Sequence, residues 1–73
     1  MNLADKIKEE YRTQVQMLFS DHPAALDTFK QMWEAGSYRE MYFFVYATIC
    51  QNDMVLTPEQ KYTDERIYWE IVN

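Results

Sequence analysis

The sequence predicts an all-α fold, a small domain of three or four helices with a helical hairpin around Gly36. Two observations carry this prediction. Apolar residues near the start recur at the three- and four-residue spacings of one helix face. The chain's single glycine stands between a helix-stop signal and a helix-start signal. The alternative is an α+β fold, with two helices and a C-terminal two-stranded antiparallel hairpin. Residues 1–73 are expected to form one compact domain.

The first helix is expected to begin after Asn2, whose side chain can cap it, with Asp5 favouring the positive end of the helix dipole. Its apolar residues fall on one face. They are Leu3, Ile7, Tyr11, Val15, Leu18 and Phe19. The helix should end near Ser20, because His22 precedes a proline and is pushed out of helical geometry.

A second helix is expected from Pro23, which suits the first turn because its missing N–H costs nothing there. Its apolar stripe consists of Leu26, Phe29, Met32 and Trp33. Gly36 stands where a helix ends in a left-handed residue. Ser37 and Glu40 then match a capping box, which predicts that a third helix starts immediately.

The third segment, Ser37 to Asn52, has no charged residue after Glu40 and is rich in aromatic and β-branched residues. It fits a helix, and its composition also fits a buried strand pairing with residues 67–72. The helix is preferred, with the core face formed by Met41, Phe44, Val45, Thr48 and Ile49. Cys50 is interpreted as a small buried apolar residue.

A fourth helix is expected from Pro58 toward Val72, because Thr57 and Gln60 form a second capping box with proline at the first helical position. A break is expected near Thr63 and Asp64. The adjacent carboxylates of Asp64 and Glu65 are interpreted as part of a solvated face.

Composition excludes several classes of function. Cys50 is the only cysteine, so no disulfide can form within the chain, and Cys50 and His22 lack the spacing of metal ligands. No cofactor is expected. The net charge of −5 disfavours direct nucleic-acid binding. Neither a signal peptide nor a membrane-spanning segment is recognisable. Together with the unpaired cysteine, this predicts a cytoplasmic protein.

No catalytic constellation can be assembled, so the chain is not expected to be an enzyme. Phosphate-binding loops need several glycines, and this chain has one. A helix-turn-helix reading of the hairpin fails because the second helix carries one arginine among aromatic residues. Mimicry of nucleic acid by an acidic patch is a minority hypothesis. Its carboxylates would be Glu34, Asp53, Glu59, Asp64, Glu65 and Glu70.

The aromatic residues are the better functional lead, because Trp and Tyr are enriched at interface hot spots. The expected partner-binding residues are Tyr38, Tyr42, Phe43, Tyr46, Tyr68 and Trp69. The favoured hypothesis is a non-enzymatic inhibitor or neutraliser of a partner protein, encoded by a phage or mobile element. That partner could itself bind nucleic acid. The alternative is a homo-oligomeric module, a homodimer in its simplest form, built on residues 38–51. A direct transcription regulator is less favoured.

Overall fold

The computed structural model describes residues 2–73, which contain four α-helices, a terminal π-helical turn and no strand. The all-α prediction is therefore confirmed, and the α+β alternative is wrong. The elements are α1 (Leu3–Leu18), α2 (Pro23–Ala35), α3 (Tyr38–Gln51), α4 (Pro58–Ile67) and η1 (Tyr68–Val72).

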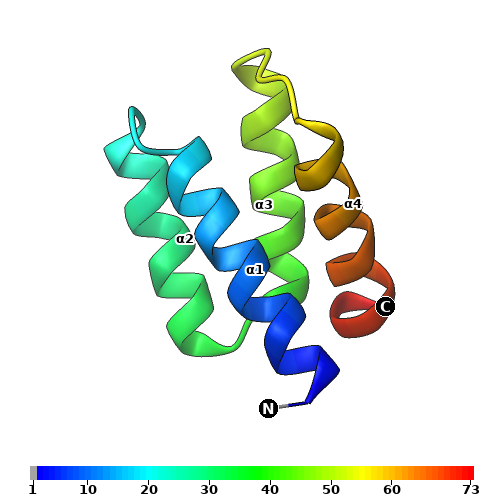
Figure 1. The fold of residues 1–73 in the computed structure, drawn as a ribbon. Helices are drawn as coiled ribbons and strands as arrows, with labels where there is room; N and C mark the ends of the chain where they lie inside the picture. The colour runs from blue at the N-terminus through cyan, green and yellow to red at the C-terminus, as the bar shows by residue number, and fades with distance from the viewer. Residues whose placement is uncertain (1) are drawn as a thin grey trace.

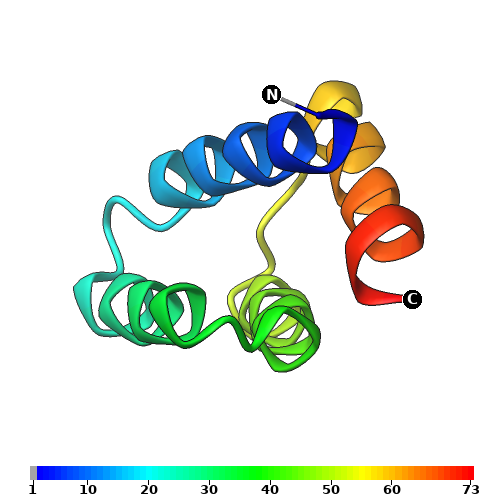
Figure 2. The ribbon, with the colours of Figure 1, turned by 90° about the horizontal axis from the view of Figure 1, so that it is seen from below.

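The helices pack as two pairs. Helix α1 lies along α4, and α2 lies antiparallel to α3 as a hairpin (Figures 1 and 2). The terminal turn η1 closes against α3 and the start of α1. As a result α2 forms one edge of the molecule and η1 forms the opposite edge, with α1 and α3 between them (Figure 1).

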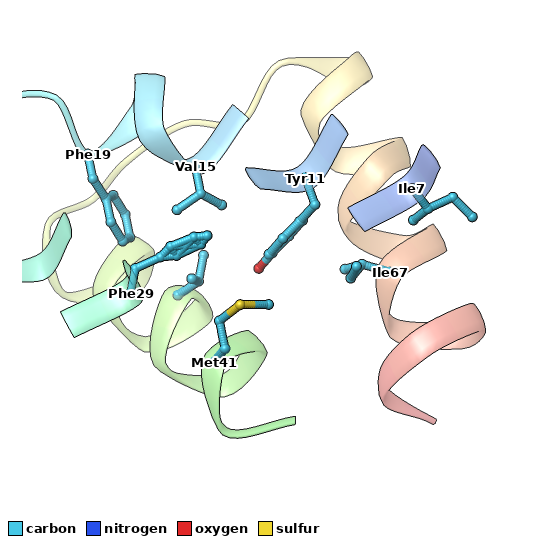
Figure 3. Packing of buried hydrophobic residues seen from close by; sticks show 8 residues of the cluster. Ile7, Tyr11, Val15, Phe19, Phe29, Met41 and Ile67 are labelled. Atoms are coloured by element: carbon cyan, nitrogen blue, oxygen red, sulfur yellow. The ribbon is translucent and has the colours of Figure 1, made fainter. Parts of the chain in front are cut away.

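The core is one cluster of side chains to which all four helices contribute. Ile7, Tyr11, Val15 and Phe19 supply one wall, so most of the apolar stripe expected for the first helix is buried. Leu3 at its beginning is exposed. The remaining members are Phe29, Met41, Val45 and Ile67. Figure 3 shows the Tyr11 ring reaching from α1 into the middle of this cluster, toward Met41.

Most helix ends form where the sequence places them. The Asn2 side chain accepts a hydrogen bond from the Asp5 N–H at 2.9 Å, and Pro23 occupies the first turn of α2. Gly36 has φ of 74°, in the left-handed region. Its N–H donates to the Trp33 carbonyl, and the Ser37 N–H donates to the Met32 carbonyl. These two bonds form a Schellman motif that ends α2.

The capping box expected at Ser37 is absent, although α3 begins at the predicted position. The Ser37 side chain makes no capping hydrogen bond. A capping box would need the Glu40 side chain to accept from the Ser37 N–H. That N–H is already donated to Met32 at 3.0 Å. The Schellman motif that ends α2 therefore uses the Ser37 N–H, which the capping box of α3 would have needed.

The second capping box is confirmed. The Thr57 hydroxyl accepts from the Gln60 N–H at 3.1 Å, and the Gln60 side chain accepts from the Thr57 N–H at 2.9 Å. The break expected near Thr63 and Asp64 is wrong, because α4 continues to Ile67. The Thr63 hydroxyl donates to the Glu59 carbonyl at 3.1 Å within the helix and is buried there. The chain leaves α-helical geometry only at η1, where it forms a π-helical turn.

Candidate functional site

Helix α3 has two apolar faces, and only one of them enters the core. Met41, Val45 and Thr48 are buried. Phe44 and Ile49, also expected in the core, are partly buried and pack against it. The outward side carries Phe43, Tyr46, Ala47 and Cys50, all of which are exposed. The interpretation of Cys50 as a buried residue is therefore wrong, because its position on α3 points away from the other helices.

The outward face of α3 continues into η1 through contacts between aromatic rings. Tyr42 and Phe43 have ring centroids 5.5 Å apart, and Tyr42 and Tyr68 are 5.2 Å apart. Tyr68 in turn lies 5.4 Å from Trp69. Exposure is 49% for Phe43, 56% for Tyr46 and 67% for Trp69. We call Phe43, Tyr46, Tyr68 and Trp69 the aromatic patch.

A surface hollow of about 110 Å³ lies between α3 and η1, within this patch. Phe43 and Tyr68 line it together with Arg39 and Val72. Most of the exposed lining of the hollow is polar, and Arg39 supplies one cation to it. The hollow exists because η1 turns the end of the chain back against α3 (Figure 2).

Tyr42 joins the patch to the interior. Its ring is half-buried beneath the patch, and its hydroxyl donates to the Asp64 carboxylate at 3.3 Å. Burial, reinforced by the Asp64 charge, raises the pKa of Tyr42 to about 12. Burial also raises the pKa of Asp64, and Glu65 adds to this effect, while the hydrogen bond from Tyr42 opposes it. Tyr42 therefore remains a hydrogen-bond donor across the neutral range.

The interpretation of Asp64 as part of a solvated face is wrong. Asp64 lines a small cavity of about 20 Å³ beneath α1, together with Tyr11, Gln14 and Gln60. The Tyr11 hydroxyl is buried without a hydrogen-bond partner, and burial raises its pKa. Sequence reasoning missed this polar group. The signal was present, because Gln60, Asp64 and Ile67 share one side of a helix.

Tyr38 is the one expected partner-binding residue that the structure places elsewhere. Its ring contacts Trp33 on α2, with centroids 5.5 Å apart, and the Lys8 ammonium lies 4.7 Å from its centre. Trp33, which belongs to the apolar stripe expected for the second helix, is partly buried and packs against the core. Tyr38 therefore belongs to the α1–α2 side of the molecule. The other five residues, including Tyr42, gather between α3 and η1.

The six acidic residues considered for nucleic-acid mimicry do not form one patch. Glu34 lies on α2 and Glu70 on η1, at opposite edges of the molecule (Figure 1), and Asp64 is partly buried and bound to the Tyr42 hydroxyl. Across residues 2–73, no three His, Cys, Asp or Glu side chains gather in a way that could hold a metal ion. Among the same residues, every helix is too short or too polar to cross a membrane.

Comparison with known proteins returned no match for this chain, whether against family models, curated proteins or solved structures.

Proposed function

We propose that this chain is a non-enzymatic binding protein that attaches to a partner protein through the aromatic patch. The observation that carries this proposal is that α3 exposes aromatic side chains opposite its buried face. Phe43 and Tyr46 are each about half exposed, and Trp69 is two-thirds exposed. A soluble domain ordinarily turns such a face inward, and contiguous exposed apolar surface marks interaction sites.

The patch is suited to binding because its rings are already held in place. Tyr68 lies between Tyr42 and Trp69, and Tyr42 is fixed from below by its hydrogen bond to Asp64. Ordering flexible side chains at an interface costs about 0.5–1.5 kcal/mol each. Rings that are packed before the partner arrives avoid part of that cost.

Charge adds a second element of selectivity. Residues 41–52 carry no charged side chain, so in this part of α3 a partner would meet only apolar side chains and uncharged hydrogen-bonding groups. The rest of the chain supplies the net charge of −5, which would steer it toward a basic partner. A nucleic-acid-binding protein has such a surface. By covering that basic surface, the chain would act as an inhibitor or neutraliser of its partner. Such a role is consistent with an origin in a phage or mobile element.

We propose that the chain acts in the cytoplasm. Cys50 is unpaired and exposed at the end of the outward face of α3. A free, exposed thiol is compatible with a reducing compartment and is a liability in an oxidising one.

An affinity-capture experiment with two matched variants tests the proposal. Tyr46→Arg places a charge within the patch, on the exposed face of α3, whereas Met17→Arg places the same charge on α1, where Met17 is 70% exposed. Both variants should fold, because both positions face solvent. A stoichiometric partner from lysate of the native host should be retained by wild type and Met17→Arg and lost with Tyr46→Arg. Equal capture by all three chains would refute the proposal.

The same face offers a second candidate function, a homodimer. Phe43, Tyr46 and Cys50 recur at spacings of three and four on α3, and no charge among them opposes self-contact. Light scattering over a range of concentrations separates the two functions. A mass that doubles with concentration in wild type and stays monomeric in Tyr46→Arg supports the homodimer. A concentration-independent monomer rules it out and leaves the partner-binding proposal.

A further inference from the structure

The exposed residues of α3 form a line along its outward side, and we call this line the α3 seam. Arg39, Phe43 and Cys50 recur at spacings of four and seven, so they lie on one side of the helix. All three are exposed, and Tyr46 and Ala47, which complete the seam, are exposed as well. In the described part of the chain, no other helix covers the side of α3 that faces away from α1 (Figure 2).

The two halves of the seam differ in the size of their side chains. The first half carries the ring of Phe43, and η1 adds Tyr68 beside the same hollow. Trp69 contacts Tyr68 and is 67% exposed. The second half carries only small side chains, and residues 47–57 contain no aromatic residue. Two such surfaces fit together closely when the large half of one lies over the small half of the other.

The two ends of the seam also differ in charge. Arg39 precedes the uncharged residues 41–52, and Asp53 directly follows them. Arg39 and Asp53 are both exposed, and among the described residues neither takes part in an ion pair. Tyr46 lies seven residues from each of them. Glu40 lies about 100° further around the helix than Arg39, away from the middle of the seam.

We propose that two copies of this chain associate through the α3 seam, with their α3 helices antiparallel and a two-fold axis beside Tyr46. Phe43 of each copy then lies over Cys50 of the other, and Arg39 lies near Asp53 of the other. Both pairings occur together because the midpoint of each falls at or just after Tyr46. A two-fold axis repeats each of these contacts. A parallel pair would instead bring each Arg39 against its own copy.

The proposal rests on the aromatic patch being a binding surface, and it names a second copy of the chain as what covers the patch in the absence of another partner. Phe43 and Tyr46 belong both to the α3 seam and to the patch. Self-association and binding of another protein therefore exclude each other. The dimer is a closed form that keeps the exposed rings from water, and a partner must displace one copy in order to bind.

Directed disulfide formation tests the antiparallel arrangement. Phe43→Cys places a thiol opposite Cys50 of the other copy. Within one helix the same two positions are about 10 Å apart along the axis, too far for a bridge. Under mild oxidation Phe43→Cys should form a covalent dimer, whereas Phe43→Cys/Cys50→Ser should not. Wild type should also remain uncrosslinked, because its two Cys50 thiols lie on opposite sides of the two-fold axis. Rapid crosslinking of wild type would indicate a parallel pair and overturn the proposal.

Sedimentation equilibrium of charge variants tests the pairing without a disulfide. Arg39→Glu should weaken the dimer by about tenfold, because attraction becomes repulsion at two symmetric places. Asp53→Asn should weaken it less, and asparagine tolerates the left-handed backbone there, where φ is 51°. In the Arg39→Glu background Asp53→Asn should instead strengthen the dimer, because it removes a like charge. This reversal requires that the two residues face each other.

Glu10→Gln is the matched control, because it removes an exposed carboxylate from α1, outside the seam. It should not weaken the dimer. The proposal is overturned if Asp53→Asn has the same effect in both backgrounds, or if wild type stays monomeric at every concentration. A monomer that still captures a partner through the patch would leave the proposed function standing. A dimer that shows the reversal and captures nothing would refute that function alone. Circular dichroism of each variant verifies that helicity is retained.

Discussion

Tyr42 is the residue on which the geometry of the aromatic patch depends. It contacts Phe43 and Tyr68 through its ring and Asp64 through its hydroxyl. A partly buried carboxylate is costly unless it receives hydrogen bonds. The same bond that positions the patch therefore also satisfies Asp64. Binding surface and core are coupled at this one side chain.

Replacing Tyr11 with phenylalanine should stabilise the protein or leave it unchanged. The Tyr11 hydroxyl is buried and has no hydrogen-bond partner. Leaving such a group unsatisfied costs about 1–3 kcal/mol, whereas the ring itself fills the core. Thermal unfolding of Tyr11→Phe should give a melting temperature equal to or above that of wild type. A loss of more than about 1 kcal/mol would show instead that the hydroxyl is satisfied in solution, by water in the neighbouring cavity.

Replacing Asp64 with asparagine should stabilise the protein at neutral pH. The pKa of Asp64 is raised above its ordinary 3.8, chiefly by burial. Between the ordinary and the raised pKa the folded protein binds more protons than the unfolded chain, so the free energy of unfolding falls as pH rises. Asparagine keeps an acceptor for Tyr42 and carries no charge. The advantage of Asp64→Asn should therefore shrink as pH falls through that window.

Urea denaturation at a series of pH values measures this difference directly. Glu10→Gln is the control, because it removes one carboxylate from an exposed position on α1. Its difference from wild type should be small and should vary little with pH. An advantage of Asp64→Asn that grows toward acid pH would contradict a raised pKa for Asp64.

At the scale of elements, helix boundaries were predictable because their causes are local. Pro23, Gly36 and Thr57 act through their own backbone or through groups within three residues. The same locality explains the failure at Ser37, where two local signals compete for one N–H. The break expected near Thr63 failed for a non-local reason. The hydroxyl of Thr63 accepts a hydrogen bond from Gln14 on α1 at 3.2 Å, a contact that no local pattern contains.

The two capping sequences should respond differently to the same substitution. Thr57→Ala should destabilise the protein by about 1 kcal/mol, because it removes a formed capping hydrogen bond. Ser37→Ala should change stability by less than about 0.5 kcal/mol, because the Ser37 side chain caps nothing. Denaturant unfolding of both variants under one set of conditions gives the comparison. Equal losses would mean that the Ser37 side chain does cap α3 in solution.

At the scale of the whole molecule, the sequence predicted which residues share a face of a helix, but it did not predict which helices pack against each other. Tyr38 and Tyr42 are one turn apart on α3 and were expected in one binding surface. The Tyr38 ring packs on Trp33 of α2, whereas the Tyr42 ring packs on Tyr68 of η1. The two rings pack on different elements because α2 covers one end of α3 and η1 covers the other side. The periodicity of apolar residues within α3 cannot predict which element will cover each residue.

Tyr46 and Val45 together test whether α3 divides its two faces between binding and folding. Val45 is 1% exposed in the core, and Tyr46, the next residue, is 56% exposed. Val45→Ala should cost about 2 kcal/mol of unfolding free energy, because it leaves a cavity among buried side chains. Tyr46→Gln should change it by less than about 0.5 kcal/mol, since it deletes no buried contact. Thermal or urea unfolding measures both. A loss at Tyr46 as large as that at Val45 would place the aromatic patch within the folded core, and a partner could not then bind it without unfolding the domain.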